Sequence, residues 1–284
     1  MILRGAPFPP LQAVTRAFKS TLEAGIAHRG PRSVVPVVFR EPSWNVSEPG
    51  PTLVEKVRDS KPDLILAVGA AALDALRPLE DVPIVYVLVH STPRWVRQRS
   101  NVTGVEMAVP PHRWLELIAG ALPGRRRLGL LYDPARTGDF VRRAQAAATG
   151  AGFTLLTKEV RAPQEVPQRL AELESLVDGF WMIPDPTVVT PQSVETLLLF
   201  SLRNRVPIVT FSESYLDLGA AVAVVLDFPT LGRQAGDLAR RILEGTPVDL
   251  LRPEPPAGVG VRVNRLVVQK LGMSAHVLEP KRGD

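Results

Sequence analysis

Two apolar runs in the second half of the chain each end in a short cluster of polar side chains. Asp185 and Thr187 follow the first run, and Ser212, Glu213 and Ser214 follow the second. In an open parallel α/β sheet, ligands bind outside the carboxyl ends of the strands, which is where these clusters fall. Carboxylates and hydroxyls there can hold a polar solute by hydrogen bonds, but neither cluster forms a catalytic set. The pattern favours a protein that holds a solute over one that transforms it.

Asp185 is the best candidate for the partner of an ammonium group. It stands at the end of a predicted strand beside the apolar side chains of Trp181 and Met182. A charge in such surroundings needs a partner or solvent. Capping of the following helix is the competing role for Asp185, and Thr187 can fill that role instead.

Further candidates in the second half of the chain also have a structural role as the alternative to ligand contact. Glu213 and Ser214 begin a predicted helix, so ligand contact competes with N-capping. Asp227 follows the last predicted strand near a crossover, where it either holds a hinge or reaches the ligand. Tyr215 and Phe8 lie near predicted loops and can sandwich a flat ligand, whereas we expect the other aromatic side chains in the core.

The first half offers backbone groups and hydroxyls. Gly69, Ala70 and Ala71 lead from a strand into a helix, whose first N–H groups suit a carboxylate. A tight turn without a ligand is the alternative interpretation. His90 and Ser91 follow the next strand. Ser91 is a candidate ligand contact, and His90 is either a pH-sensitive contact or a structural group.

Motifs that carry catalysis or bind cofactors are missing from the sequence. It has no Gly-x-Gly-x-x-Gly after a strand, no phosphate-binding loop, no Gly-x-Ser-x-Gly and no His-Glu-x-x-His. It has no cysteine, and its four histidines are too far apart to form a metal-binding pattern. We therefore predict no catalytic residues, no cofactor and no metal.

The length and the charge of the chain limit which classes of protein it can belong to. A chain of 284 residues favours two lobes and can bury a core without a disulfide or a metal. The net charge of +5 is spread along the chain, with Arg125–Arg127 as its tightest run, so we expect no nucleic-acid partner. We see no signal peptide or lipobox cysteine at the N-terminus, and no run of about 18 apolar residues that would span a membrane.

Short apolar runs alternate with amphipathic stretches, which predicts βαβ units and parallel sheets. The predicted strands are Ile2–Gly5, Val34–Phe39, Leu64–Val68, Ile84–Val89, Leu128–Tyr132, Phe153–Thr157, Phe180–Ile183, Ile208–Phe211 and Ala221–Leu226. The predicted helices are Leu11–Ala24, Thr52–Ser60, Ala70–Leu76, Pro111–Ala121, Gly138–Gly150, Val166–Leu176, Val194–Arg203 and Leu231–Leu243.

The alternation breaks around Ser100–Pro110 and again after Gly245, where Pro, Gly and Asp interrupt the pattern. We interpret both breaks as connections between two lobes. Residues 1–104 with 227–252 are expected in lobe 1, and residues 105–226 with 253–284 in lobe 2. Hinge bending is expected near Val105, Leu226 and Pro253.

Five segments, in order, resemble one family, the ABC-transporter substrate-binding proteins of the tryptophan/tyrosine type. They are NVTGV at 101–105, LPGRRRLGLLYDP at 122–134, DGFWMIPDPTVV at 178–189, GAAVAVVLDFPTLGRQA at 219–235 and VNRLVVQKLGM at 263–273. The resemblance covers nearly the whole chain. It implies the type I periplasmic-binding-protein fold, with two Rossmann-like α/β lobes, parallel sheets, a three-crossover hinge and a ligand held between the lobes.

Two departures from the family's pattern fall at expected ligand contacts. Gly69-Ala70 stands where amino-acid-binding members often carry Gly-Thr, and Asp185-Pro186-Thr187 stands where they tend to carry Asp-Asn-Thr. The first lacks a hydroxyl and the second an amide. Both bear on the identity of the ligand and leave the fold untouched.

We therefore expect a monomeric solute-binding protein of an ABC importer. It would bind an amino acid or related small carboxylate and deliver it to a membrane permease, in the periplasm or on the extracellular side of the membrane. A ligand-sensing module of a signalling system with the same fold is the alternative. An enzyme on the same scaffold is the third possibility, and turnover of a bound solute would reveal it.

Overall fold

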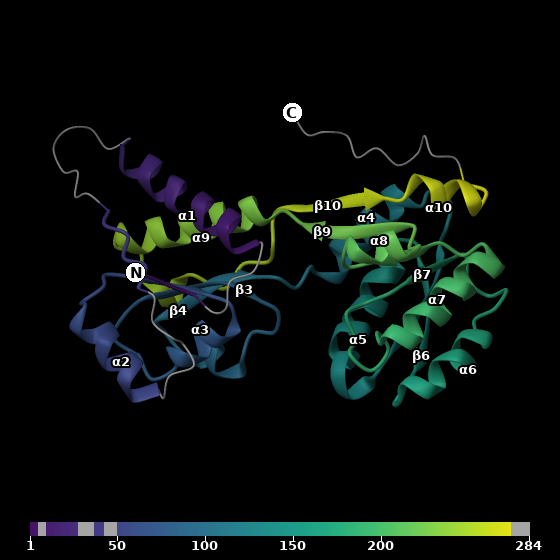
Figure 1. Ribbon diagram of the computed structural model, residues 1–284, viewed down its shortest axis with the longest axis horizontal. Coiled ribbons are helices and arrows are strands. Elements are labelled where there is room, and N and C mark those ends of the chain that lie inside the picture. The colour runs from purple at the N-terminus through teal and green to yellow at the C-terminus, as the bar shows by residue number, and fades with distance from the viewer. Residues whose placement is uncertain (5–9, 28–36, 43–49, 274–284) are drawn as a thin grey trace. The chain divides into compact units, whose positions relative to one another are not determined.

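The computed structural model describes residues 1–4, 10–27, 37–42 and 50–273. The chain forms two compact units, and each is built from separate stretches of sequence. Unit 1 comprises Met1–Val109 and Leu226–Gly258, and unit 2 comprises Pro110–Val225 and the chain from Val259 onward. This division into units does not test the lobe boundaries expected from the sequence, which remain a prediction. The predicted class, α/β units with parallel sheets, is confirmed (Figure 1).

Among the described residues, the sheet of unit 1 has four parallel strands in the same order as in the chain. They are β1 (Ile2–Arg4), β2 (Ile65–Val68), β3 (Ile84–Val89) and β4 (Val102–Glu106). Its helices are α1 (Pro10–Ala27), α2 (Gly50–Asp59), α3 (Ala70–Ala75) and α9 (Phe228–Leu243), with 3₁₀ turns at Arg94–Gln98 and Val248–Leu250.

Side chains alternate between the two faces of this sheet, and helices bury both faces. Leu66, Val68, Val85 and Val87 join the core formed with α1 and α9. The intervening side chains, such as Ile65 and Tyr86, join the core formed with α2 and α3. In Figure 1, α1 and α9 lie side by side over the first face. A sheet covered on both faces requires strands that are apolar throughout, which is what the sequence has.

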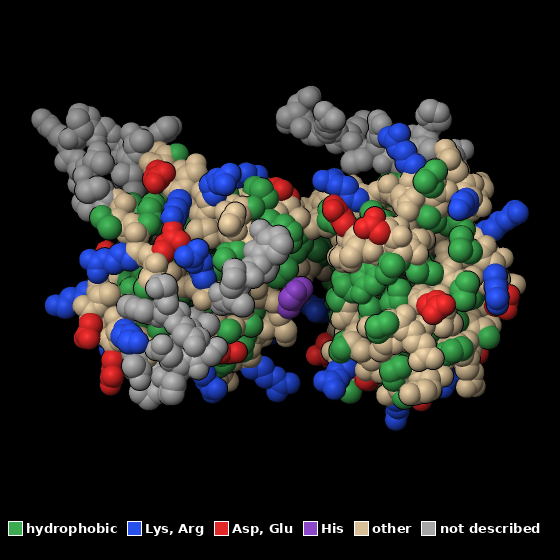
Figure 2. Space-filling view, viewed as in Figure 1, with side chains coloured by type: hydrophobic (Ala, Val, Ile, Leu, Met, Phe, Trp, Pro, Cys, Tyr) green, Lys and Arg blue, Asp and Glu red, His purple; other side chains and the backbone are tan. Residues whose placement is uncertain are grey.

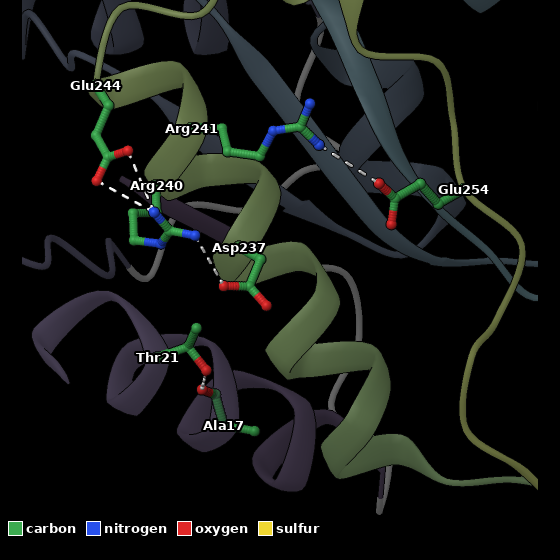
Figure 3. A network of polar contacts seen from close by, with 7 residues as sticks. All are labelled: Ala17, Thr21, Asp237, Arg240, Arg241, Glu244 and Glu254. Carbon is green, nitrogen blue, oxygen red and sulfur yellow. Dashed lines mark hydrogen bonds and ion pairs between the residues drawn. The ribbon is translucent and has the colours of Figure 1, made fainter. Parts of the chain in front are cut away.

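Two glycines allow α1 and α9 to pack closely. A Cβ added at Gly232 would lie 2.3 Å from the carbonyl oxygen of Val14, and one at Gly236 would lie 2.8 Å from Cβ of Thr21. Helix α9 also carries ion pairs, shown in Figure 3. Arg240 contacts Asp237 and Glu244, and Arg241 contacts Glu254 at 3.8 Å.

In the described part of unit 2, the sheet has six strands in the order β10-β9-β8-β7-β5-β6. The strands are β5 (Arg127–Tyr132), β6 (Thr154–Glu159), β7 (Gly179–Trp181), β8 (Ile208–Thr210), β9 (Val222–Leu226) and β10 (Val259–Val263). The pairs from β6 through β5, β7 and β8 to β9 are parallel. Its helices are α4 (Pro111–Ala121), α5 (Pro134–Gly150), α6 (Val166–Ala171), α7 (Pro191–Asn204), α8 (Ser214–Leu218) and α10 (Arg265–Lys270), with a 3₁₀ turn at Pro163–Glu165.

The two faces of this second sheet are also buried. Phe180 and Met182 belong to a core that includes side chains of α6 and α7. Trp181, between them in the sequence, points to the opposite face. Its ring lies 5.5 Å from that of Trp114 on α4 and 5.6 Å from that of Phe140 on α5, measured between centroids. The apolar wall expected around Trp181 and Met182 is therefore the interior of the unit.

Several elements differ from those predicted. The described part of the Val34–Phe39 segment, residues 37–39, is not a strand, although the carbonyl of Arg40 accepts a hydrogen bond of 2.8 Å from the N–H of Ile2. Strands β4 and β10 were predicted as connections because Gly and Pro interrupt or flank them. The helix expected to begin at Glu213 and Ser214 is the five-residue α8, and the six-residue α10 was not predicted.

Among the described residues, no helix is both long enough and apolar enough to cross a bilayer. On the face drawn in Figure 2, Lys and Arg side chains are scattered over both units and do not gather into one patch.

Candidate functional site

The strand order of unit 2 creates a switch point between β5 and β7. After β5 the chain forms β6 on one side, and then β7 on the other side of β5. Crossovers that leave in opposite directions open a crevice outside the carboxyl ends of the two strands. Asp133 directly follows β5, and Asp185 lies four residues after the end of β7. The sequence thus places two carboxylates at the position where this kind of sheet binds ligands.

Asp185 is buried, with no exposed surface. One carboxylate oxygen accepts hydrogen bonds from the N–H groups of Thr187 (2.9 Å) and Val188 (3.2 Å). The other accepts from the N–H of Asp133 (2.8 Å) and the hydroxyl of Thr137 (2.5 Å). Four donors occupy the lone pairs of a carboxylate, so Asp185 joins the loop after β5 to the loop after β7. Its predicted contact with an ammonium group remains a prediction, and this conformation leaves the carboxylate no open face for one.

Asp133 was not proposed as a ligand contact from the sequence, yet it is the more accessible carboxylate. It caps α5 by accepting from the N–H of Ala135 at 2.9 Å, and the hydroxyl of Thr187 donates to its other oxygen at 2.7 Å. These bonds, the one from Thr187 first, lower the pKa of Asp133 below its ordinary value of 3.8. Asp133 is therefore an anion at neutral pH. Thr187 also contacts Asp185, so its side chain and backbone bridge both carboxylates.

The three candidate residues at the start of α8 make different kinds of contact. Glu213 is exposed and pairs with Arg262 at 3.3 Å, with no side-chain bond that caps α8. The hydroxyl of Ser214 lies 2.9 Å from that of Ser212. The ring of Tyr215 packs edge-on against Phe211, with 5.3 Å between centroids, as part of the core boundary. These three ligand-binding predictions remain untested by the geometry.

Asp227 caps α9. Its carboxylate accepts from the N–H of Thr230 at 3.2 Å and from the hydroxyl of the same residue, and Arg233 lies 3.5 Å away. The cap of α9 alone accounts for an Asp at this position. Contact with a ligand remains a prediction, and Phe8 lies outside the described residues.

In unit 1, the loops after β2 and β3 carry the predicted contacts. Gly69 precedes α3 with φ of 88°, a conformation that favours glycine, and its N–H donates to the carbonyl of Val87 at 2.9 Å. Ala70 and Ala71 form the exposed first turn of α3. His90 and Ser91 are exposed directly after β3. All five lie at the carboxyl edge of the sheet, where the βαβ pattern places them.

A further group at this edge was missed from the sequence. The phenol oxygen of Tyr86 lies 3.4 Å from the hydroxyl of Thr92, which in turn donates to Glu106 at 3.5 Å. Burial raises the pKa of Tyr86 to about 12, so the phenol stays protonated. Glu106 ends β4, which the sequence-based prediction treated as a connection. Identifying NVTGVE as a strand would have placed its last residue at the carboxyl edge.

Two other features bear on the location of the site. A cavity of about 830 Å³ in unit 1 lies at the opposite, amino-terminal ends of the strands, next to Leu64 and Pro83. Ligands of parallel α/β sheets bind at the carboxyl ends, so this cavity is not the candidate site. Within the described part of the chain, no three His, Asp or Glu side chains are arranged to hold a metal ion.

A family model identifies the family of this chain. The family model described as ABC transporter substrate binding protein matches residues 48–277. A relative named tyrosine-binding protein, from Clostridioides difficile, is 23% identical over 206 residues. That match covers 69% of this chain and 59% of the relative, so the chain spans less than two thirds of that protein's length.

Solved structures share the fold. The ligand-free, open form of a substrate-binding protein with adhesive properties from Clostridium difficile has a TM-score of 0.75 at 20% identity, covering 99% of this chain and 95% of that one. A domain from Streptococcus pneumonia in complex with L-Trp has a TM-score of 0.58 at 21% identity, covering 97% and 95%. A substrate-binding protein from Desulfitobacterium hafniense in complex with Leu has a TM-score of 0.56 at 10% identity, covering 95% and 87%.

Proposed function

Because the chain belongs to the family of ABC transporter substrate-binding proteins, we propose that it binds an amino acid or a related small carboxylate and delivers it to a membrane permease. The family match over residues 48–277 is the observation that carries the proposal. Relatives whose names or ligands point to tyrosine, tryptophan and leucine support an amino acid as the solute. We further propose that the protein acts as a monomer on the outer side of the membrane.

The polar groups at the carboxyl ends of the strands support reversible binding of a solute. The carboxyl ends of the strands carry hydroxyls, carboxylates and backbone N–H groups, and the proposed contacts there include Ser91, Thr187 and the first turn of α3. The family is one of substrate-binding proteins, and the sequence contains no Gly-x-Ser-x-Gly, no His-Glu-x-x-His and no phosphate-binding loop. In this proposal the first-turn N–H groups of Ala70 and Ala71 face the solute's carboxylate.

Thermal-shift screening of the full chain tests the proposal. The standard L-amino acids are compared with their D-isomers and with small carboxylates. A solute at about 100 times its Kd should stabilise the protein by roughly 2.7 kcal/mol, which raises the unfolding midpoint by about 5 °C. Isothermal titration then gives the affinity. If no compound raises the midpoint and none gives a binding heat, the proposed function is wrong.

A further inference from the structure

Glu106 is a carboxylate that the fold does not account for. It ends β4 and caps no helix, whereas Asp133 and Asp227 at comparable strand ends cap α5 and α9. It is partly buried, and the one donor to its side chain in the described structure is the Thr92 hydroxyl, at a long 3.5 Å. Among the described residues no Lys or Arg forms an ion pair with it. A partly buried carboxylate with one weak donor needs a further partner, which solvent or a ligand can supply.

The backbone of β3 and β4 is arranged so that Glu106 reaches the edge of the sheet. Tyr86 pairs with Gly104, but the next pairing joins Val89 to Glu106, so β3 has one extra residue in a bulge. Leu88, inside the bulge, has φ of 60°, which is unfavourable for a side chain of its kind. Bulges often re-aim side chains next to functional sites. This one makes β3 and β4 end together, with Glu106 beside the loop that carries His90, Ser91 and Thr92.

The polar neighbours of Glu106 suit a cationic group. The Tyr86 phenol remains a neutral donor and acceptor because burial raises its pKa to about 12. With the Thr92 hydroxyl it forms a short chain of oxygen atoms that leads to the carboxylate. Oxygen acceptors around one negative charge match the three N–H bonds of a primary ammonium group. Asp185, the ammonium partner expected from the sequence, has all its acceptor positions filled by internal donors.

We infer that Glu106, with the Thr92 hydroxyl that the buried Tyr86 phenol contacts, binds the positively charged amino group of the solute. The inference rests on the proposed function and assigns its solute to a chemical class, small molecules with a primary ammonium group. A solute with a carboxylate and no ammonium group would leave Glu106 without a counter-charge, so the site discriminates against it.

The test compares how matched pairs of solutes bind to the 284-residue chain, measured by isothermal titration. L-tyrosine, L-tryptophan and L-leucine are each measured beside the counterpart in which hydrogen replaces the ammonium group. The wild-type protein should bind the amino acid of the fitting pair at least about 10-fold more tightly than its counterpart. In Glu106→Gln, which keeps the shape and removes the charge, that ratio should fall to about threefold or less.

Two controls separate this role from a structural one. Glu55→Gln removes an exposed carboxylate on α2 of the same unit and should leave the ratio unchanged. The unfolding midpoint of ligand-free Glu106→Gln should stay within about 2 °C of wild type.

A Glu106→Gln protein that keeps the full preference for ammonium overturns the inference. Equal wild-type binding of both members of a pair overturns it too, but leaves the proposed function standing. If the wild-type protein binds neither member of any pair, the inference fails along with the proposed function for these solutes.

Discussion

Asp185 and Glu106 show how differently two carboxylates at strand ends can be used. Asp185 has no exposed surface and accepts four internal hydrogen bonds. Glu106 is partly buried and accepts one long hydrogen bond among the described residues. Internal donors compensate for the loss of solvent around the first carboxylate, whereas the second has one weak internal donor and remains partly open to solvent or a ligand. The first is therefore expected to affect stability and the second to affect binding.

We predict that Asp185→Asn lowers the free energy of unfolding by about 2–4 kcal/mol. In Asp185→Asn, an NH₂ group replaces one carboxylate oxygen, so a donor now faces the donors that bound that oxygen. The Thr137 hydroxyl can turn to accept from it, but the N–H of Asp133 cannot, so one buried donor loses its partner. Denaturation by urea measures the change.

Asp139→Asn is the matched control, since Asp139 is an exposed carboxylate on the neighbouring helix and pairs with Arg142. It should change the free energy of unfolding by less than about 0.5 kcal/mol. If Asp185→Asn unfolds like wild type but loses affinity for the solute, Asp185 binds the ligand after all.

At the scale of elements, the contact between α1 and α9 depends on two residues without side chains. We predict that Gly232→Ala lowers the free energy of unfolding by about 1–3 kcal/mol, despite the better helix propensity of alanine. A methyl group there meets the backbone of α1, the carbonyl of Val14, so one helix has to move. Chemical denaturation followed by far-UV circular dichroism gives the value.

Gly120→Ala on α4 is the control for helix propensity, because a Cβ at Gly120 meets no atom within 4 Å. It should be neutral or stabilising by up to about 1 kcal/mol. Equal effects of the two substitutions would mean that α1 and α9 do not pack as closely as described.

The elements also show what the sequence could and could not predict. Long apolar runs such as Ile84–Val89 and amphipathic stretches such as Pro111–Ala121 were predicted correctly, because their periodicity is strong. Strand β4 was missed because Gly104 interrupts it. That glycine is required by packing across the sheet, since a Cβ there would lie 2.3 Å from the carbonyl oxygen of Tyr86. Local propensity does not report a contact with a residue that far away in sequence.

The candidate site was harder to predict than the fold for a related reason. The sequence placed Asp185, Thr187, His90 and Ser91 at carboxyl ends of strands, where the structure has them. It did not show that Asp185 is enclosed, because its donors come from two loops about 50 residues apart. Burial of a loop residue depends on how separate loops meet, and no single segment encodes that.

At the scale of the whole molecule, unit 1 is discontinuous. Leu231, Ala235, Leu238 and Ala239 of α9 are fully or almost fully buried in the same core as α1 and the strands. We therefore predict that a fragment of residues 1–109 does not fold, because one face of its sheet lacks α9. Adding a peptide of residues 226–258 should restore structure, as measured by ¹⁵N–¹H NMR dispersion of the labelled fragment.

A scrambled peptide of the same composition is the control, and it should leave the spectrum collapsed. A dispersed spectrum from residues 1–109 alone would show that α9 is not needed for unit 1 to fold.

The same discontinuity sets an order of events during synthesis. The strands and α1 of unit 1 leave the ribosome before residues 110–225, and α9 leaves after them. At about 5–20 residues per second, this delay lasts roughly 6–23 s, longer than the folding time of most single domains. During that time the apolar face that α9 will cover stays open, while much of unit 2 can already form. Unit 1 begins first and is completed second, so the nascent chain carries an exposed apolar surface that a chaperone can recognise.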